Sequence, residues 1–446
     1  MEDENYGDIN GENYRLAHIN NRMEKILSSL SYRLGNLIVD SIRKPWKMLL
    51  LPMNIILLFY SYSIERLGRK RVNYSNSRAL SYPPRNCVIL FPTNGVGMGH
   101  MSRMIALAKS LQSKKPSLEI VFFTTNYVIH HLYQNGFTCY HLPGRKKFSQ
   151  MTPSQWNSIC EDKLSDVISL HRPSVFVFDG SYPYRGMLNA IKGREEIHKV
   201  WVRRSGRKDL FELPNDSLAH FDRLVIPDDY LELELEPKKA TEMGVDQINF
   251  APPMISVSRN DLLPRGSLRG RLGIPKDALV CLVSLGAGVV NEIKDVRNFV
   301  VDSLTSREIY VIIADSMLNP TKVINGNKFL RYIKEYPLMH FRNCFDFSII
   351  SGGYNSIHEA VHLRLPSLIL PNENTGSDDQ LTRAIRASEN GGFIVIEQED
   401  YDLLELGIER ICDADVRKQM IQSMQTKDKS IDGSPYIAEA LLFPLD

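Results

Sequence analysis

The chain has 446 residues, of which 43% are hydrophobic and 24% charged, and its formal net charge is +2 at pH 7. A chain of this length and composition can bury sizeable cores and, at roughly 100–200 residues per domain, predicts two or three domains. A net charge this small argues against a nucleic-acid-binding protein, because duplex binding depends on clustered Lys and Arg that neutralise phosphates. We therefore expect a globular protein with no nucleic-acid partner.

The six cysteines are scattered along the sequence and form no Cys-x-x-Cys pair. Several lie inside apolar runs, where a free thiol behaves as a small hydrophobic group, so they predict a reducing cytosol and no structural zinc. The start of the chain, MEDENYGDINGEN, lacks the basic and apolar regions of a signal peptide. These features predict a cytoplasmic location, and we expect no cofactor.

Residues 1–84 predict a helical N-terminal extension and linker. Apolar residues spaced alternately by three and four predict a helix in its first part, at Leu16, Ile19, Met23, Ile26 and Leu30. This spacing fits an ordinary amphipathic helix or a coiled-coil seam of about two heptads. The second alternative would make the protein a homo-oligomer, and the sequence leaves both open.

The second part of the extension, residues 43–71, predicts a membrane-associating segment. Its centre, from Met48 to Tyr62, is strongly apolar, and basic residues flank it on both sides. The run is shorter than the ~20 residues that span a bilayer, and Pro52 interrupts it. Basic flanks with Trp46 and other aromatic residues are typical of a segment in the interface of an anionic cytoplasmic leaflet. We therefore expect peripheral attachment to the inner face of the cell membrane; the alternative is a helix packed on the protein's own body.

Short apolar runs alternate with helical patterns after the linker and predict an α/β fold. Continuous apolar runs are typical of strands buried on both faces, and intervening helices imply parallel sheets. The predicted strands are residues 87–91, 119–125, 139–142, 174–180, 199–204 and 223–227 and, after a proline-rich interruption at 250–266, residues 280–288, 308–315, 339–341, 347–353, 366–371 and 392–397. This series predicts two Rossmann-like domains facing each other across a cleft, over 85–252 and 253–430, followed by a C-terminal helix over 431–446.

Glycine-rich and polar segments follow the predicted strands, where parallel sheets bind their ligands. Gly352 and Gly353 precede a helix whose exposed amides and dipole favour a diphosphate. Glu359 lies about one turn further on, from where its carboxylate can accept hydrogen bonds from two ribose hydroxyls. The alternative is a tight turn followed by a solvated glutamate. A later helix starts with Asp379 and Gln380, which fit a sugar-binding pair or a plain helix N-cap.

The segment PTNGVGMGH after the first predicted strand contains a candidate catalytic histidine. His100 lies where the glycine-rich loop, with Gly97 and Gly99, meets its helix. An imidazole titrates near neutral pH, so it can take a proton from an attacking hydroxyl. Asp179 ends another strand of the same sheet and can hydrogen-bond the second ring nitrogen. The alternative is a structural histidine.

Other strand ends predict anion contacts. Arg203 and Arg204 follow one strand, where guanidinium groups favour phosphate or carboxylate, although a solvated loop is an equal alternative. Gly286 and Gly288 follow the first strand of the second series and offer backbone amides. No Asp-x-Asp motif follows a strand in a setting suited to a divalent ion, so we expect a reaction without a metal ion.

Together these residues resemble the GT-B glycosyltransferases, in particular the UDP-glycosyltransferases and the N-acetylglucosaminyl transferase that makes lipid II. The resemblance covers about residues 85–446 and is most specific in SGGYNSIHEAVHLRLPSLILPNENTGSDDQ. It implies that the two glycines of SGG approach the diphosphate, Glu359 binds the ribose, and Asp379 with Gln380 contacts the donor sugar. It also implies that His100 is the general base and that the C-terminal helix returns onto the first domain.

The full set of expected donor-binding residues is Gly286, Gly288, Gly352, Gly353, Asn355, Ser356, Glu359, Asp379 and Gln380. The sequence departs from the family in two places. GVGMGH differs from the GGTGGH loop of the lipid II enzyme, and the tryptophan that leads the plant-type donor box is absent. These departures leave the sugar and the acceptor open.

The sequence therefore predicts an inverting transfer of a hexosyl or N-acetylhexosaminyl group from a UDP-type donor to a hydroxyl of a lipid-linked or surface-polysaccharide acceptor. Two alternatives stay open. One is a nucleotide-sugar epimerase or hydrolase of the same fold, because function depends on the site and not on the scaffold. The other is a non-catalytic nucleotide-sugar-binding subunit of a membrane complex.

Overall fold

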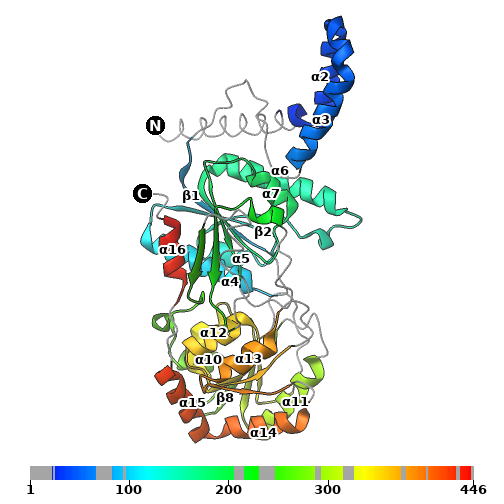
Figure 1. Ribbon diagram of the computed structural model, residues 1–446. Helices are drawn as coiled ribbons and strands as arrows, with labels where there is room; N and C mark the ends of the chain where they lie inside the picture. The colour runs from blue at the N-terminus through cyan, green and yellow to red at the C-terminus, as the bar shows by residue number, and fades with distance from the viewer. Residues whose placement is uncertain are drawn as a thin grey trace.

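The computed structural model contains two parallel β-sheets, each covered by helices. One sheet lies above the other in Figure 1. It describes residues 23, 26–66, 83–93, 97–204, 215–230, 247–286, 293–314, 326–372, 378–397, 400–427 and 432–442. We name the part built on the first sheet the N-terminal lobe and the part built on the second sheet the C-terminal lobe. The predicted α/β class with two Rossmann-like units is confirmed.

The sheet of the N-terminal lobe has seven parallel strands in the order β3-β2-β1-β4-β5-β6-β7. They are β1 (Arg85–Pro92), β2 (Glu119–Thr124), β3 (Thr138–His141), β4 (Pro173–Asp179), β5 (His198–Val202), β6 (Arg223–Pro227) and β7 (Gln247–Ala251). The helices are α4 (Gly99–Lys114), α5 (His130–Gln134), α6 (Pro153–His171), α7 (Arg185–Ile191) and α8 (Asn215–Leu218). Alternate side chains of the central strands enter two separate apolar cores, which is why these strands are apolar throughout.

The sheet of the C-terminal lobe has six parallel strands in the order β10-β9-β8-β11-β12-β13. They are β8 (Val280–Ser284), β9 (Tyr310–Ala314), β10 (Leu330–Ile333), β11 (Phe347–Ser351), β12 (Ser367–Leu370) and β13 (Phe393–Val395). The helices are α10 (Gly266–Arg271), α11 (Ile293–Ser306), α12 (Tyr354–His362), α13 (Gln380–Ser388), α14 (Tyr401–Cys412) and α15 (Ala414–Lys427), with 3₁₀ turns η3 (Arg259–Asp261) and η4 (Leu338–Cys344). Apolar side chains again fill a core on each face.

The structure corrects the predicted strand at 339–341, which lies in the 3₁₀ segment η4. Met339 and Phe341 are both buried and flank a polar residue, so they imitate the alternation of a strand. Pro337 precedes the first turn, and the Arg342 guanidinium donates hydrogen bonds to three backbone carbonyls, which fixes the turn. The edge strands β7 and β10 were not predicted, because neither contains a continuous apolar run.

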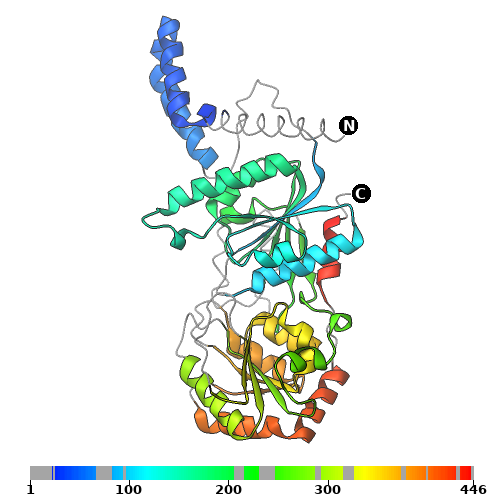
Figure 2. The same ribbon diagram turned by 180° about the vertical axis from the view of Figure 1, so that it is seen from behind.

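The C-terminal helix α16 (Ser434–Leu442) packs against α4 of the N-terminal lobe (Figure 2). Its apolar residues belong to the same core cluster as α4. At its start, the backbone N–H of Gly433 donates to the Pro253 carbonyl at 2.8 Å. An exposed ion pair joins Lys114 and Glu439 at 2.9 Å. Helix α16 thereby contacts the N-terminal lobe, and the residue before it contacts the connection between the lobes.

The N-terminal extension forms a hairpin of α2 (Leu30–Arg43) and α3 (Leu51–Arg66), joined by η1 (Pro45–Leu50), and projects from the N-terminal lobe (Figure 1). Among the described residues, each helix falls short of the length and apolar character that a bilayer span requires. The hairpin is nonetheless strongly apolar on its surface, and Leu49 at its corner is 87% exposed.

Candidate functional site

His100 and Asp179 lie side by side at the carboxyl end of the first sheet. Asp179 is the last residue of β4, and His100 is in the first turn of α4, which follows the neighbouring strand β1. The Nδ1 atom of His100 is 2.9 Å from Oδ1 of Asp179. The structure thus brings together the two residues that the sequence proposed as base and partner.

Arg103, one helical turn after His100, completes this cluster and was missed by sequence reasoning. Its Nε donates to Asp179 Oδ2 at 3.1 Å, and its Nη2 donates to Asp179 Oδ1 at 2.8 Å. Nη2 also lies 2.8 Å from His100 Nδ1. Residues three apart share a helix face, so the spacing from His100 was the available signal. The guanidinium compensates the buried carboxylate, since their side chains are only 2% and 1% exposed.

The protonation states of this cluster suit a general base. Burial lowers the pKa of His100, the charge of Asp179 opposes this, and the charges of Arg103 and Arg204 act with burial. Burial alone would raise the pKa of Asp179, but the charge and hydrogen bonds of Arg103, together with the adjacent His100, hold that pKa below its ordinary value. At neutral pH the imidazole is therefore uncharged, which is the charge state that a general base requires.

The N-terminus of α12 faces this cluster from the C-terminal lobe. Gly353 is the N-cap residue, and Gly352 links it to β11. A Cβ on Gly352 would lie 2.7 Å from the backbone oxygen of Gln380, so close packing requires glycine there. A Cβ on Gly353 would have no neighbour nearer than 3.8 Å. The first N–H groups of a helix have no intrahelical acceptor, so this end of α12 is suited to an anion.

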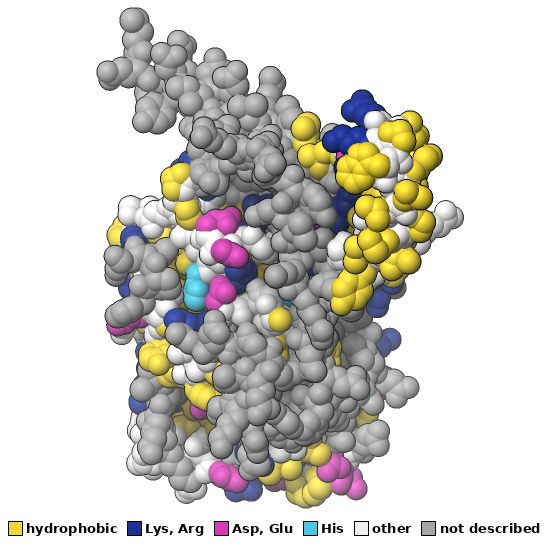
Figure 3. All heavy atoms as spheres, turned by 45° about the horizontal axis from the view of Figure 1, so that its top comes forward, with side chains coloured by type: hydrophobic (Ala, Val, Ile, Leu, Met, Phe, Trp, Pro, Cys, Tyr) yellow, Lys and Arg dark blue, Asp and Glu magenta, His cyan; other side chains and the backbone are white. Residues whose placement is uncertain are grey.

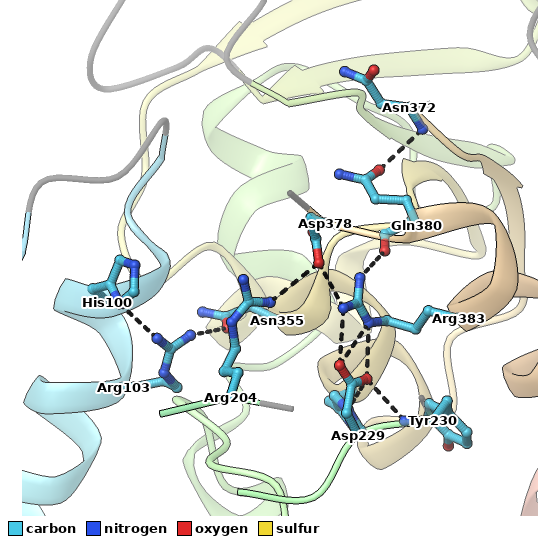
Figure 4. Close-up of polar contacts among 12 residues, drawn as sticks. His100, Arg103, Arg204, Asp229, Tyr230, Asn355, Asn372, Asp378, Gln380 and Arg383 are labelled. Carbon is cyan, nitrogen blue, oxygen red and sulfur yellow. Dashed lines mark hydrogen bonds and ion pairs between the residues drawn. The ribbon is translucent and has the colours of Figure 1, made fainter. Parts of the chain in front are cut away.

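Asn355 joins the N-terminus of α12 to the histidine cluster across the two lobes (Figure 4). Its Oδ1 accepts a hydrogen bond from Arg103 Nη1 at 3.4 Å, and its Nδ2 donates to the Gly99 carbonyl at 3.4 Å. Ser356 lies beside it in the same first turn. The guanidinium carbons of Arg103 and Arg204 lie 5.6 and 5.2 Å from the centroid of the Tyr354 ring. The base candidate and the anion-binding candidate therefore form one site.

Glu359 lies further along α12 and is half-buried. Its Oε1 accepts a short hydrogen bond from the Ser256 hydroxyl. Burial raises the pKa of Glu359 to about 7, although the bond from Ser256 acts in the opposite direction. The carboxyl therefore changes its charge near neutral pH, and ribose binding by Glu359 stays a prediction.

The side chains of Asp379 and Gln380 both accept hydrogen bonds from backbone N–H groups of the C-terminal lobe. Asp379 is the N-cap of α13, and its Oδ1 accepts from the Thr382 N–H at 3.2 Å. The Oε1 of Gln380 accepts from the Asn372 N–H at 3.0 Å. The N-cap alternative for Asp379 is thus present in the structure, and contact of either side chain with a sugar stays a prediction.

A second contact between the lobes is a buried ion pair of Asp229 and Arg383, which sequence reasoning also missed. Asp229 follows β6, and Arg383 lies on α13; both side chains are fully buried. Arg383 Nε is 2.8 Å from Asp229 Oδ1, and its Nη2 is 2.9 Å from Oδ2. Arg383 also donates to the Gly352 carbonyl at 3.0 Å and to Asp378 Oδ1 at 2.7 Å. This pair therefore holds the glycines before α12 against the N-terminal lobe.

Two predicted arginines lie in different surroundings. Arg204 lies at the interface between the lobes, with Nη1 3.7 Å from Asp378 Oδ1. Arg203 is buried in the N-terminal lobe, over the ring of Trp201. The structure brings Arg204 next to Tyr354, the first residue of α12.

The remaining predicted glycines are near the ends of the first strands of the two sheets. Gly97 precedes α4 and has open space where a Cβ would lie. Gly286 follows β8 with φ +91°, a left-handed conformation that favours glycine. Gly288 lies outside the described residues.

No protein-family model matches the chain. A curated protein of Methanopyrus kandleri, an uncharacterized glycosyltransferase, is 25% identical over 237 residues, which are 52% of this chain and 64% of that protein. The chain thus spans less than two thirds of this relative. MurG of Acinetobacter baumannii superimposes with a TM-score of 0.52 at 12% identity, over 80% of this chain and 99% of the other. A putative UDP-N-acetylglucosamine 2-epimerase of Listeria monocytogenes superimposes with a TM-score of 0.55 at 13% identity, over 81% and 96%.

The chain has the GT-B fold. In this GT-B fold the histidine cluster and the α12 N-terminus lie at the carboxyl ends of their own sheets, where parallel sheets bind ligands. A ligand site at those ends stays a prediction.

Among the described residues, one group could hold a metal ion, and it lies at the opposite end of the first GT-B sheet: Cys87, Glu119 and His171. His171 Nδ1 is 2.7 Å from Glu119 Oε1, and its Nε2 is 2.9 Å from the Tyr140 hydroxyl. Both ring nitrogens are thus engaged within the protein, and Arg85 lies 3.7 Å from Glu119. This group belongs to the packing of the lobe and not to the candidate site.

Proposed function

We propose that the protein is an inverting glycosyltransferase that moves a sugar from a UDP-type nucleotide sugar to a hydroxyl of a lipid-linked or polysaccharide acceptor. The observation that carries this proposal is the position of His100, which lies 2.9 Å from Asp179 and next to the N-terminus of α12 across the lobes. The curated relative, itself named a glycosyltransferase, and the GT-B fold support it.

The proposed reaction uses each lobe for a different task. Nε2 of His100 takes the proton of the acceptor hydroxyl, and the oxygen attacks the anomeric carbon from the face opposite the diphosphate. The bond from the anomeric carbon to the diphosphate oxygen breaks, and the diphosphate leaves with the electron pair. Amides after β8 and β11, the N-terminus of α12 and the Arg204 guanidinium stabilise its charge. Glu359 accepts from the ribose hydroxyls, and Asp379 with Gln380 contacts the sugar.

The experiment that tests this proposal measures nucleotide-sugar consumption with and without an acceptor. A thermal-shift panel first identifies the donor, because a ligand that binds only the folded state raises its midpoint. A glycosyltransferase consumes this donor only with an acceptor. The similarity to a putative UDP-N-acetylglucosamine 2-epimerase favours an epimerase as the second candidate. That candidate, or a hydrolase, is supported if the donor is converted without acceptor.

The ribose-binding role of Glu359 is tested by pH. Because its pKa is about 7, the carboxylate forms as pH rises from 6 to 8, and UDP affinity is expected to rise with it. Glu359→Gln should weaken UDP binding at pH 8 by about tenfold or more, since hydrogen bonds to a charged group contribute about 1.5–3 kcal/mol. Calorimetric titration at pH 6 and 8 measures both effects.

The same carboxyl gives the opposite trend in the stability of the UDP-free protein. Its pKa in the unfolded chain is about 4.3. Between that pH and 7 the folded protein holds a proton that the unfolded chain has lost, so this group lowers stability as pH rises. Glu359→Gln should remove the part of the pH dependence of the melting temperature that falls in this window. Equal pH slopes of wild type and variant would contradict the assignment.

The two glycines before α12 offer a matched pair of variants. Gly352→Ala places Cβ 2.7 Å from the Gln380 backbone oxygen, and such overpacking is expected to cost about 1–3 kcal/mol of stability. Gly353→Ala has room for its methyl group at an ordinary helical N-cap φ of −66°, so stability should hold. Its methyl group would lie where the diphosphate approaches, so UDP affinity should fall. Thermal melts and UDP titration separate the two effects, and unchanged UDP affinity of Gly353→Ala would place the diphosphate elsewhere.

We further propose that the hairpin of α2 and α3 attaches the enzyme peripherally to the anionic inner face of the cell membrane. Apolar side chains cover its surface (Figure 3), most of them strongly exposed: Ile38, Val39, Ile42, Trp46, Met48, Leu49, Leu50, Met53, Ile56, Leu57, Phe59 and Tyr60. Arg43 and Lys44 are exposed at the corner, where Lys47 also lies. Apolar and aromatic area beside cations is complementary to an anionic bilayer surface.

Vesicle sedimentation tests the membrane proposal. Leu49→Glu combined with Trp46→Ala should reduce binding to anionic vesicles by about tenfold or more, because each buried apolar side chain contributes about 1.5–3 kcal/mol. Leu403→Glu is the matched control, since Leu403 is also half exposed but lies on α14. Hairpin-dependent homo-oligomers without vesicle binding would show that a second copy covers this surface instead.

A further inference from the structure

Two groups compete for one nitrogen of the proposed base. Asp179 Oδ1 lies 2.9 Å from His100 Nδ1 and needs a proton on that nitrogen. Arg103 Nη2 lies 2.8 Å from the same nitrogen and needs its lone pair. A neutral imidazole satisfies only one of them, because it carries one N–H. The position of the Arg103 guanidinium therefore decides which tautomer of His100 forms.

The contacts in the structure favour the tautomer in which His100 Nδ1 is unprotonated and accepts a hydrogen bond from Arg103. Nη2 carries two hydrogens, one for Asp179 Oδ1 at 2.8 Å and one for His100 Nδ1. Only with Nδ1 unprotonated do both hydrogens of Nη2 have acceptors; Nε donates to Asp179 Oδ2, and Nη1 donates one of its two hydrogens to Asn355 Oδ1. A buried donor without a partner costs about 1–3 kcal/mol. His100 is 16% exposed, so its other nitrogen can bond to water.

We propose that Arg103 is a positioning residue that holds His100 in the inactive tautomer, with the proton on Nε2, until a nucleoside diphosphate binds at the N-terminus of α12. The anion then accepts the hydrogen bond of Nη2. The Nε2 proton passes to solvent, and a solvent proton adds at Nδ1 and bonds to Asp179. Nε2 now has a free lone pair, and the imidazole stays neutral throughout.

The contacts of Arg103 with the C-terminal lobe provide the coupling. Its guanidinium carbon lies 5.6 Å from the ring of Tyr354, the first residue of α12, and its Nη1 reaches Asn355 in the same turn. An anion held by the amides of this turn therefore lies next to the guanidinium. The consequence is ordered catalysis, in which the base becomes competent only after the donor is bound. This inference rests on the proposed function for the identity of the anion.

The experiment reads the tautomer directly by NMR of protein labelled with ¹⁵N-histidine, with the His100 signals assigned from a His100→Gln variant. At pH 7.5 the free protein should show Nδ1 unprotonated, and saturating UDP should move the proton to Nδ1. Arg103→Met should show a protonated Nδ1 with and without UDP. Arg204→Met is the matched control. Arg204 lies over the same Tyr354 ring as Arg103, but the contact with His100 Nδ1 is made by Arg103. Without UDP, the Arg204→Met variant should therefore show the same His100 tautomer as wild type.

The outcomes separate this inference from the proposed function. A protonated Nδ1 in the free wild type overturns the inference, as does UDP binding without a change of tautomer. Failure of UDP to bind overturns the proposed donor, and inorganic pyrophosphate then replaces UDP as the anion in the same measurement. If Arg103→Met does not fold, the comparison of free and UDP-bound wild type decides the question alone.

Discussion

Replacing His100 by alanine is expected to lower the rate of sugar transfer about 10²–10⁴-fold, the usual contribution of a positioned general base. The affinity for UDP should stay nearly unchanged, because none of the diphosphate and ribose contacts proposed here is made by the His100 side chain. Steady-state rates with the identified donor and acceptor, together with UDP titration, measure both quantities. A rate loss without an affinity loss separates a base from a residue that builds the donor site.

His130→Ala is the matched control, because His130 is exposed on α5 and lies outside the site. Asp179→Asn should also lower the rate, since a carboxylate at Nδ1 stabilises the imidazolium that forms. Transfer by His100→Ala at the wild-type rate would refute the base assignment while leaving the donor site standing.

The pH dependence of the reaction gives a further test of His100. The base acts when uncharged, and burial lowers the pKa of His100 below its ordinary value. The fall of kcat/KM on the acidic side should therefore occur below pH 6.5. Around neutral pH the titration of His100 should leave kcat/KM unchanged. Glu359 also changes its charge near pH 7 and would add its own pH dependence to the profile. The pH profile is therefore compared between wild type and Glu359→Gln at saturating donor.

The fold and half of the site could be predicted because their signals are local in the sequence. Strands such as β1 and β4 are buried on both faces, and the residues in their centres are therefore all apolar. Asp179 ends β4 and His100 lies in the first turn of the helix after β1, so the topology of a parallel sheet brings them to one edge. The segment at 339–341 shows the limit of this reasoning, because a short alternating pattern also fits a 3₁₀ turn.

The charged residues that join the lobes could not be predicted from the sequence. A buried Arg is stable only with a partner, and Asp229 is 154 positions from Arg383 along the chain. Arg103 likewise finds Asp179 and Asn355 across long separations. In the sequence these arginines look like solvated helix residues, and only the packing of one lobe on the other gives them their roles.

Removing the guanidinium of Arg383 is expected to cause the largest loss of stability among single substitutions at the lobe interface. Among the described residues, Arg383→Met leaves the buried Asp229 carboxylate with the Tyr230 backbone N–H at 2.8 Å and His358 Nε2 at 3.4 Å, and without a guanidinium. Loss of one partner of a buried ion pair costs about 3–5 kcal/mol, because the other charge stays buried without compensation. The melting temperature and the urea midpoint measure this loss, and UDP affinity should fall with them because Arg383 also holds the Gly352 carbonyl.

The matched control is Glu439→Gln, which breaks the exposed pair with Lys114 and should leave the melting temperature within experimental error. The pH dependence supplies a second check. Burial would raise the pKa of Asp229, but its bonds to His358 and Arg383 lower it to about 2. Its contribution to stability is therefore complete above the unfolded pKa of about 3.9 and is lost as pH falls toward 2. Arg383→Met should lack most of this acid-sensitive part, whereas a variant as stable and as acid-sensitive as wild type would show that the lobes are held together without this pair.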